Sequence, residues 1–228
     1  MAKIVAIHAD CDDLKFLRPL QRTLTSWVGE NLQWYCLNSV QSHGPATQAL
    51  GQVSKGLALI LLHGRSDGFR GGDYCTSPTD DAPAMFLERG AMDSLNGKAV
   101  FCLSCKGNEH GGEIVSKGAS VFLGFDDVPF SRFDPVSRRE IYRHSLTLHS
   151  QQLILSAVTD SLERLILKGE SFEDIANYLR LWVRRSALEF IRQNPSEEYR
   201  NDISHLFLKM ADTVKVYGDG KLTFSDLS

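Results

Sequence analysis

The sequence has no excess of charge of either sign and no long hydrophobic run. Its 228 residues carry 25 Lys and Arg against 28 Asp and Glu, so the net charge is only −3. A charge this small gives no reason to expect binding to nucleic acid or to an anionic membrane. No apolar run approaches the length that crosses a bilayer. The chain begins almost directly with a strand-like run and not with a leader segment, so we expect a cytoplasmic protein.

Cysteine is scarce, and internal repeats and low-complexity segments are absent. An odd number of irregularly spaced cysteines is not typical of the disulfide framework of a small secreted domain, so we expect free thiols. The five are Cys11, Cys36, Cys75, Cys102 and Cys105. The length fits one domain with a full core. We predict a single domain over residues 1–228, with the sheet core in residues 1–130 and a mainly helical part in residues 131–228.

Strand and helix patterns alternate along the chain. Apolar runs on consecutive residues are typical of strands that are covered on both faces, and the alternation favours a parallel sheet with helical crossovers. The sequence therefore predicts an α/β fold. The predicted strands are residues 3–9, 32–37, 57–62, 98–104, 120–125 and 214–217. The predicted helices are residues 17–27, 45–53, 82–95 and 113–117, followed by three C-terminal helices of which the second begins at Ser171 with a capping box.

Two of the apolar runs end in residues capable of acyl-transfer chemistry. Residues 57–62 lead to His63 and Gly64, and residues 99–103 lead, after a serine, to Cys105. Ligands of open α/β sheets bind beyond the carboxyl ends of the strands. A thiol nucleophile, a histidine base and backbone N–H donors for an oxyanion are the components of a cysteine protease. We take Gly64 and Cys105 as those donors. The alternative interpretation is a buried structural cysteine and a core histidine.

The same residues resemble the caspase-like cysteine peptidases of clan CD, a superfamily that includes caspases, metacaspases, gingipains, separases and the bacterial CHAT proteases. LILLHG and VFCLSCKG are similar to the two blocks that end in its catalytic histidine and cysteine. SKGASVFLGF and LERLILKGESFEDIANY resemble segments of the CHAT-type members. The resemblance spans most of residues 3–185. It departs from metacaspases at Leu103, where they carry an acidic residue.

The resemblance implies a three-layer fold with a sheet of about six strands and a dyad of His63 and Cys105 on adjacent central strands. It implies a cysteine endopeptidase with a protein or peptide substrate and without a cofactor or metal. Bacterial relatives often act in stress or antiphage defence, where an activating protein or small-molecule signal turns the protease on. Residues 65–81 are then the segment that such a signal would order. The alternative is a catalytically silent binding or signalling module that uses the helical C-terminal region as a partner surface.

Acidic residues after two strands predict a preference for basic substrates. Asp126 and Asp127 follow the fifth predicted strand, and Asp12 and Asp13 follow the first. Members of the superfamily often hold a basic residue before the scissile bond, and carboxylates pair well with Arg and Lys. We predict such a pocket, with Asp127 and Asp13 as the preferred pair. Caps of helices and solvated turns are the alternative roles for these residues.

Three other functions fit the sequence less well. A phosphotransfer receiver requires an Asp after the third strand and a Lys after the fifth, where this chain has histidine and aspartate. Cys102 and Cys105 have the spacing of a redox or zinc pair, but Cys102 lies inside an apolar run and no second pair follows. A Cys-dependent phosphatase requires an Arg where Gly111 stands. His110 lies close enough to Cys105 to line the site, but a loop-surface histidine is the simpler interpretation.

Overall fold

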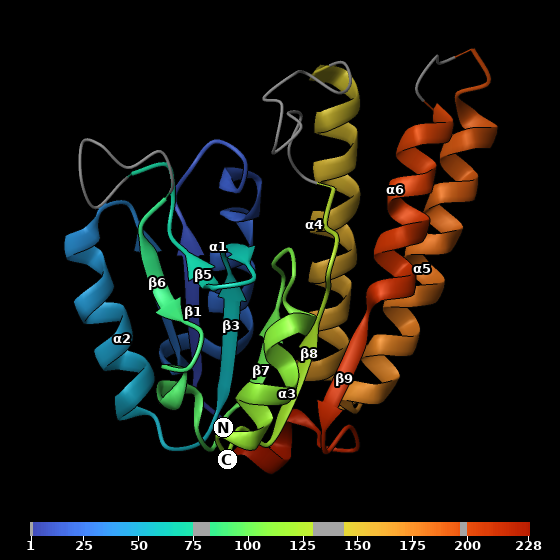
Figure 1. Cartoon of the computed structure of the whole chain (residues 1–228). Coiled ribbons are helices and arrows are strands. Elements are labelled where there is room, and N and C mark those ends of the chain that lie inside the picture. Colours follow the sequence, from blue (N-terminus) through green and yellow to red (C-terminus); the bar gives the residue numbers. More distant parts are fainter. Residues whose placement is uncertain (1, 75–82, 130–143, 197–199) are drawn as a thin grey trace.

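The computed structural model covers the whole chain and describes residues 2–74, 83–129, 144–196 and 200–228, except for the side chains of residues 144–147. Its centre is a six-stranded sheet in the order β2-β1-β3-β7-β8-β9 (Figure 1). The strands are β1 (Ile4–Ala9), β2 (Leu32–Leu37), β3 (Leu57–Leu61), β7 (Ala99–Cys102), β8 (Val121–Gly124) and β9 (Lys215–Gly218). All neighbours pair in parallel except β8 and β9. The predicted α/β fold with a mostly parallel sheet is confirmed.

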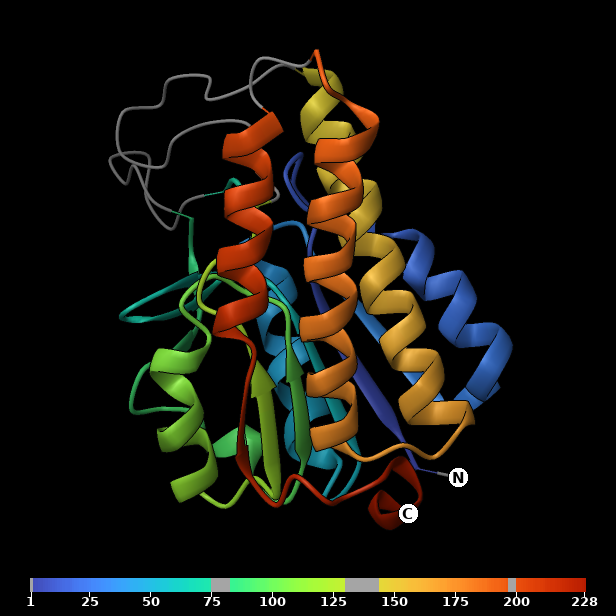
Figure 2. The ribbon, with the colours of Figure 1, turned by 90° about the vertical axis from the view of Figure 1, so that its right-hand side faces the viewer.

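The helices form the two outer layers. They are α1 (Pro19–Val28), α2 (His43–Gln52), α3 (Asn108–Ser116), α4 (His144–Leu167), α5 (Phe172–Gln193) and α6 (Arg200–Thr213). Figure 2 shows α1, α4 and α5 on one face of the sheet and α2 and α3 on the other. Every residue of β1, β3, β7 and β8 is consequently buried, which explains the continuous apolar runs. The Nε2 atom of His8, the polar residue of β1, lies 2.9 Å from the Leu14 carbonyl oxygen.

Local signals for helix ends are confirmed where the sequence showed them. Pro19 occupies the first turn of α1, where its missing N–H costs no hydrogen bond, and Gly29 ends that helix with a φ of 56°. Ser171 and Asp174 form the predicted capping box of α5, because each side chain accepts a hydrogen bond from the other's backbone N–H. The end of α1 and the start of α5 therefore lie where the sequence signals predict them.

A second, smaller sheet contradicts two of the predictions. Its strands are β4 (His63–Arg65), β5 (Gly68–Arg70) and β6 (Met85–Glu88), which pair antiparallel. The polar loop expected after Gly64 is thus partly a hairpin, and the helix expected over residues 82–95 is a strand followed by a short 3-10 turn. Phe69 and Leu87 are buried by this pairing, and tertiary burial outweighs a local helical pattern. Residues 75–82, the rest of the predicted loop and the start of the predicted helix, lie outside the described residues.

The helical C-terminal half packs on the same hydrophobic core as the sheet. Ile154, Leu162 and Leu179 are buried together with residues of β1 and β3. After α6 the chain returns as β9 and pairs with β8 at the edge of the sheet. Within the described ranges, no helix combines the length and the apolar character that crossing a membrane requires.

Candidate active site

His63 and Cys105 lie at the carboxyl ends of neighbouring central strands. Residues Leu57 to Ile60 of β3 pair with Ala99 to Cys102 of β7 in parallel, without a shift in register. His63 opens β4 two residues after β3, and Cys105 follows β7 by three residues. Parallel strands that are in register end at the same sheet edge. The two residues predicted as base and nucleophile therefore come from adjacent strand ends.

Gly64 brings the two strand ends into direct contact. A Cβ atom at position 64 would lie 1.7 Å from the Cys105 carbonyl oxygen and 2.4 Å from Ser104 Oγ. No side chain fits there, so the backbone of β4 lies directly against the backbone of the cysteine. Ser104 is fully buried, and its hydroxyl has no hydrogen-bond partner among the described residues.

The turn after Cys105 has an uncommon backbone conformation. Lys106 has a φ of 55°, and no other non-glycine residue in the described ranges has a positive φ. The Lys106 N–H donates to the Asp126 carbonyl at 2.7 Å, which holds the turn in this conformation. None of the hydrogen bonds between described residues uses the N–H of Cys105. Left-handed non-glycine residues are costly and tend to occur where function requires them.

Two side chains of the segment after Cys105 bind the hairpin that carries His63. The Lys106 ammonium donates to Ser66 Oγ at 2.8 Å, and His110 Nε2 lies 2.6 Å from the Arg65 carbonyl oxygen. The interpretation of His110 as a loop-surface residue is wrong: it lies in α3 and is fully buried. The helix begins at Asn108, earlier than predicted. These contacts keep the hairpin and the cysteine turn in a constant relative position.

A residue that the sequence analysis did not select contacts the histidine. Cys11 Sγ lies 3.2 Å from His63 Nε2. Burial lowers the pKa of His63, and the carboxylates of Asp13 and Asp73 partly oppose that shift. His63 is therefore a neutral imidazole at neutral pH. Cys11 follows β1 by two residues, so the strand-end rule that selected His63 and Cys105 also applies to it.

Both thiols at this sheet edge are protonated in the resting protein. Burial raises the pKa of the Cys105 thiol, and the carboxylates of Asp127 and Asp126 raise it further. The pKa of Cys11 is raised to about 12, mainly by burial and then by the charge of Asp73. Cys105 is partly exposed whereas Cys11 is buried. Cys105 is consequently the more accessible of the two cysteines. The cysteines of the described ranges are all free, and Cys75 lies outside those ranges.

The four predicted acidic residues have different environments. Asp12 is largely exposed and binds Lys15 at 2.8 Å. The Asp127 carboxylate is partly exposed and lies 3.1 Å from the Lys209 ammonium. Asp126 has a buried carboxylate oxygen without a hydrogen-bond partner among the described residues, and Asp13 is close enough to His63 to raise its pKa. Asp12 and Asp127 thus bind lysine side chains, while the charges of Asp127 and Asp126 act on Cys105 and that of Asp13 acts on His63.

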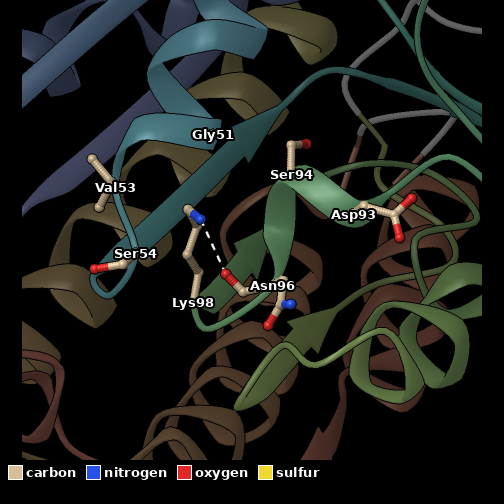
Figure 3. Close-up of a pocket in the computed structure, with 7 residues that line it drawn as sticks. All are labelled: Gly51, Val53, Ser54, Asp93, Ser94, Asn96 and Lys98. Carbon is tan, nitrogen blue, oxygen red and sulfur yellow. Dashed lines mark hydrogen bonds between the residues drawn. The ribbon is translucent and has the colours of Figure 1, made fainter.

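A cavity lies at the opposite edge of the sheet. Its volume is about 290 Å³, and its lining includes Ser54, Asn96 and Lys98 (Figure 3). The buried Lys98 ammonium donates to the Asn96 carbonyl at 3.1 Å, and burial lowers its pKa. Lys98 directly precedes β7, whereas Cys105 follows that strand. The cavity is therefore separated from the cysteine by the length of β7.

Comparisons with known proteins identify no family and no relative from which the roles of these residues could be transferred. The sequence matches no model of a known protein family and no curated protein.

Proposed function

We propose that this chain is a cysteine endopeptidase with a dyad of Cys105 and His63. The observation that carries the proposal is the backbone contact between Gly64 and Cys105, which joins the ends of two central strands in one site. A partly exposed cysteine, a neutral imidazole and a backbone N–H that has no partner among the described residues then occupy one sheet edge. These are the groups that acyl transfer from a peptide requires.

The reaction begins with a proton transfer, because the Cys105 thiol is protonated at rest. His63 Nε2 lies against Cys11 Sγ, and in the tautomer that carries its proton on Nε2, Nδ1 keeps the lone pair that accepts the Cys105 proton. The sulfur forms a bond to the peptide carbonyl carbon, and the N–H groups of Gly64 and Cys105 donate to the oxyanion. His63 returns the proton to the leaving amine as the C–N bond breaks. Water then hydrolyses the thioester and regenerates the thiol.

The resemblance to the caspase-like peptidases supports the same activity. That resemblance implies a dyad on adjacent central strands of a sheet of about six strands, and the two blocks end on β3 and β7 of such a sheet. We extend the proposal to a CHAT-type cytoplasmic protease in stress or antiphage defence that an activating protein or small-molecule signal turns on. The protonated Cys105 is consistent with a resting state that awaits such a signal.

The acidic residues of the site favour cleavage after Arg or Lys. The charge of Asp13 reaches His63 and the charges of Asp127 and Asp126 reach Cys105, and carboxylates at these positions pair well with Arg or Lys. We therefore assign the specificity pocket to the predicted pair of Asp127 and Asp13, with Asp126 beside them. A peptide-library cleavage profile tests this assignment, because Asp127→Asn is expected to weaken the preference for basic residues.

Substitution of the dyad tests the activity. Cys105→Ala and His63→Ala are each expected to lower the cleavage rate by about 10³-fold or more, because each removes several kcal/mol of transition-state stabilisation. The melting temperature is expected to remain close to that of the parent. A peptide probe with a thiol-reactive group is expected to label Cys105, and the labelling is expected to require His63. Cleavage at the parent rate by Cys105→Ala would refute the proposal.

A second candidate function is a binding or signalling module without turnover. The observation in its favour is the raised pKa of Cys105, since a nucleophile that is protonated at rest is also what an inactive relative would retain. The helical C-terminal region would then be the partner surface. Failure of peptide probes to label Cys105 with every tested activator would favour this function over the protease.

A further inference from the structure

Cys11, His63 and Asp73 form a cluster of three different donor groups beside the proposed dyad. One ligand atom from each residue lies within 4.8 Å of the other two. Cys11 follows β1, His63 opens β4 and Asp73 follows β5. Cys11 lies 52 residues before His63, whereas Asp73 follows the hairpin that His63 opens, so the fold brings Cys11 to the other two.

The donor set matches the preferences of zinc. Sulfur, imidazole nitrogen and carboxylate oxygen are the protein ligands of Zn²⁺, with bonds of about 2.0 to 2.3 Å in a tetrahedral site. Such bonds separate neighbouring ligand atoms by roughly 3.5 Å. Cys11 Sγ and His63 Nε2 are 3.2 Å apart, so a small adjustment admits the ion between them. Three protein ligands leave the fourth position to water.

The charges around the cluster favour a cation. Asp73 lies within the cluster itself, and Asp13, two residues after Cys11, carries a second carboxylate. A divalent ion in this field replaces the Cys11 proton: the thiol releases H⁺ to solvent, and the thiolate binds the metal. Asp73 is exposed, which gives the ion a path from solvent.

We propose that Cys11, His63 and Asp73 form a binding site for Zn²⁺ or a similar transition-metal ion, and that the bound ion switches the dyad off. The second part rests on the proposed protease function. When Nε2 of the neutral imidazole binds a metal ion, the ring carries its proton on Nδ1. Nδ1 then has no lone pair for the Cys105 proton, so His63 cannot start the reaction.

Cobalt titration of the Cys105→Ala full-length chain tests the site without any need for protease activity. Co²⁺ bound to a thiolate absorbs in the near ultraviolet. We expect this band to saturate at about one ion per chain and to decrease when Zn²⁺ is added. Cys11→Ser is expected to remove the band, and Asp73→Asn to weaken Co²⁺ binding by about tenfold or more. Cys36→Ser, which changes a cysteine of β2, is the matched control and is expected to leave the band unchanged.

The outcomes separate the metal site from the protease. The metal site would be overturned if no cobalt band forms, or if Cys11→Ser and Asp73→Asn both leave the band unchanged. If Cys11→Ser does not fold, the result for Asp73→Asn alone decides. In a peptide-cleavage assay, Zn²⁺ is expected to inhibit cleavage by the parent chain, and a chelator is expected to restore the cleavage rate. The Asp73→Asn variant is expected to require about tenfold more Zn²⁺ for the same inhibition. A saturable cobalt band, together with a parent chain that cleaves no peptide and whose Cys105 no peptide probe labels with any tested activator, would retain the site and remove the proposed function.

Discussion

The two ends of the central strands, which we call the amino edge and the carboxyl edge of the main sheet, differ in the residues that adopt a left-handed backbone conformation. At the amino edge, Gly56, Gly97, Gly118 and Gly218 have a positive φ in the turns that enter or leave the strands. At the carboxyl edge, the left-handed residue is Lys106, whose side chain reaches Ser66 on the hairpin. Glycine adopts this conformation at no steric cost, and lysine does not. The left-handed positions at the amino edge are therefore unstrained, because glycine occupies them. At the carboxyl edge Lys106 is strained, and its side chain makes a contact beside Cys105.

The largest expected effect on activity comes from adding a single methyl group at Gly64, on the carboxyl edge. Gly64→Ala places a Cβ atom where the Cys105 carbonyl oxygen lies, so the hairpin and the cysteine turn must separate. We expect the cleavage rate to fall by about 10²-fold or more, because small displacements of catalytic groups are costly. Gly112→Ala, on the exposed side of α3 with nothing within 4 Å, is the matched control. Equal rates for the two variants would show that the backbone contact is irrelevant to the chemistry.

A methyl group at the amino edge is expected to change stability and not activity. Gly97 has a φ of 74°, and a Cβ atom there would lie 2.3 Å from the Ser54 carbonyl oxygen. We expect Gly97→Ala to lower the free energy of unfolding by about 1 to 3 kcal/mol, with an unchanged cleavage rate per folded molecule. Gly90 also has a positive φ but nothing within 4 Å, so Gly90→Ala isolates the cost of the conformation. Denaturant titration measures the free energy of unfolding of both variants. An equal loss of stability in Gly97→Ala and Gly90→Ala would show that the contact with the Ser54 carbonyl oxygen has no cost.

The smallest expected effect concerns the charges of the carboxyl edge. The Asp127 carboxylate raises the pKa of Cys105, so Asp127→Asn is expected to lower that pKa and to shift the pH profile of Cys105 alkylation toward lower pH. At a fixed pH below the midpoint, the thiolate fraction and the alkylation rate increase. Asp12→Asn removes a carboxylate that binds Lys15 on the surface and is expected to leave the profile unchanged. A shift toward higher pH in Asp127→Asn would contradict the assigned electrostatics.

Much of the large sheet could be predicted, because its signals are local. The runs at β1, β3 and β8 are apolar over consecutive residues, and the capping box of α5 requires only Ser171 and Asp174. The small sheet could not be predicted in the same way. Residues of β6 have a pattern compatible with a helix, and they become a strand only because β5 offers a partner. A short strand owes its conformation to its neighbour more than to its own residues.

The same division applies to the candidate site. The sequence by itself determined that His63 and Cys105 follow buried strands, because the apolar runs and the residues that follow them are close together in the chain. Only the tertiary structure decided that Cys11 contacts His63, that Asp73 joins them, and that Asp126 has a buried oxygen without a partner among the described residues. Cys11 and His63 are separated by 52 residues, and no local pattern encodes such a contact. It follows from strand order and register, which depend on how all the helices and strands bury their apolar faces together.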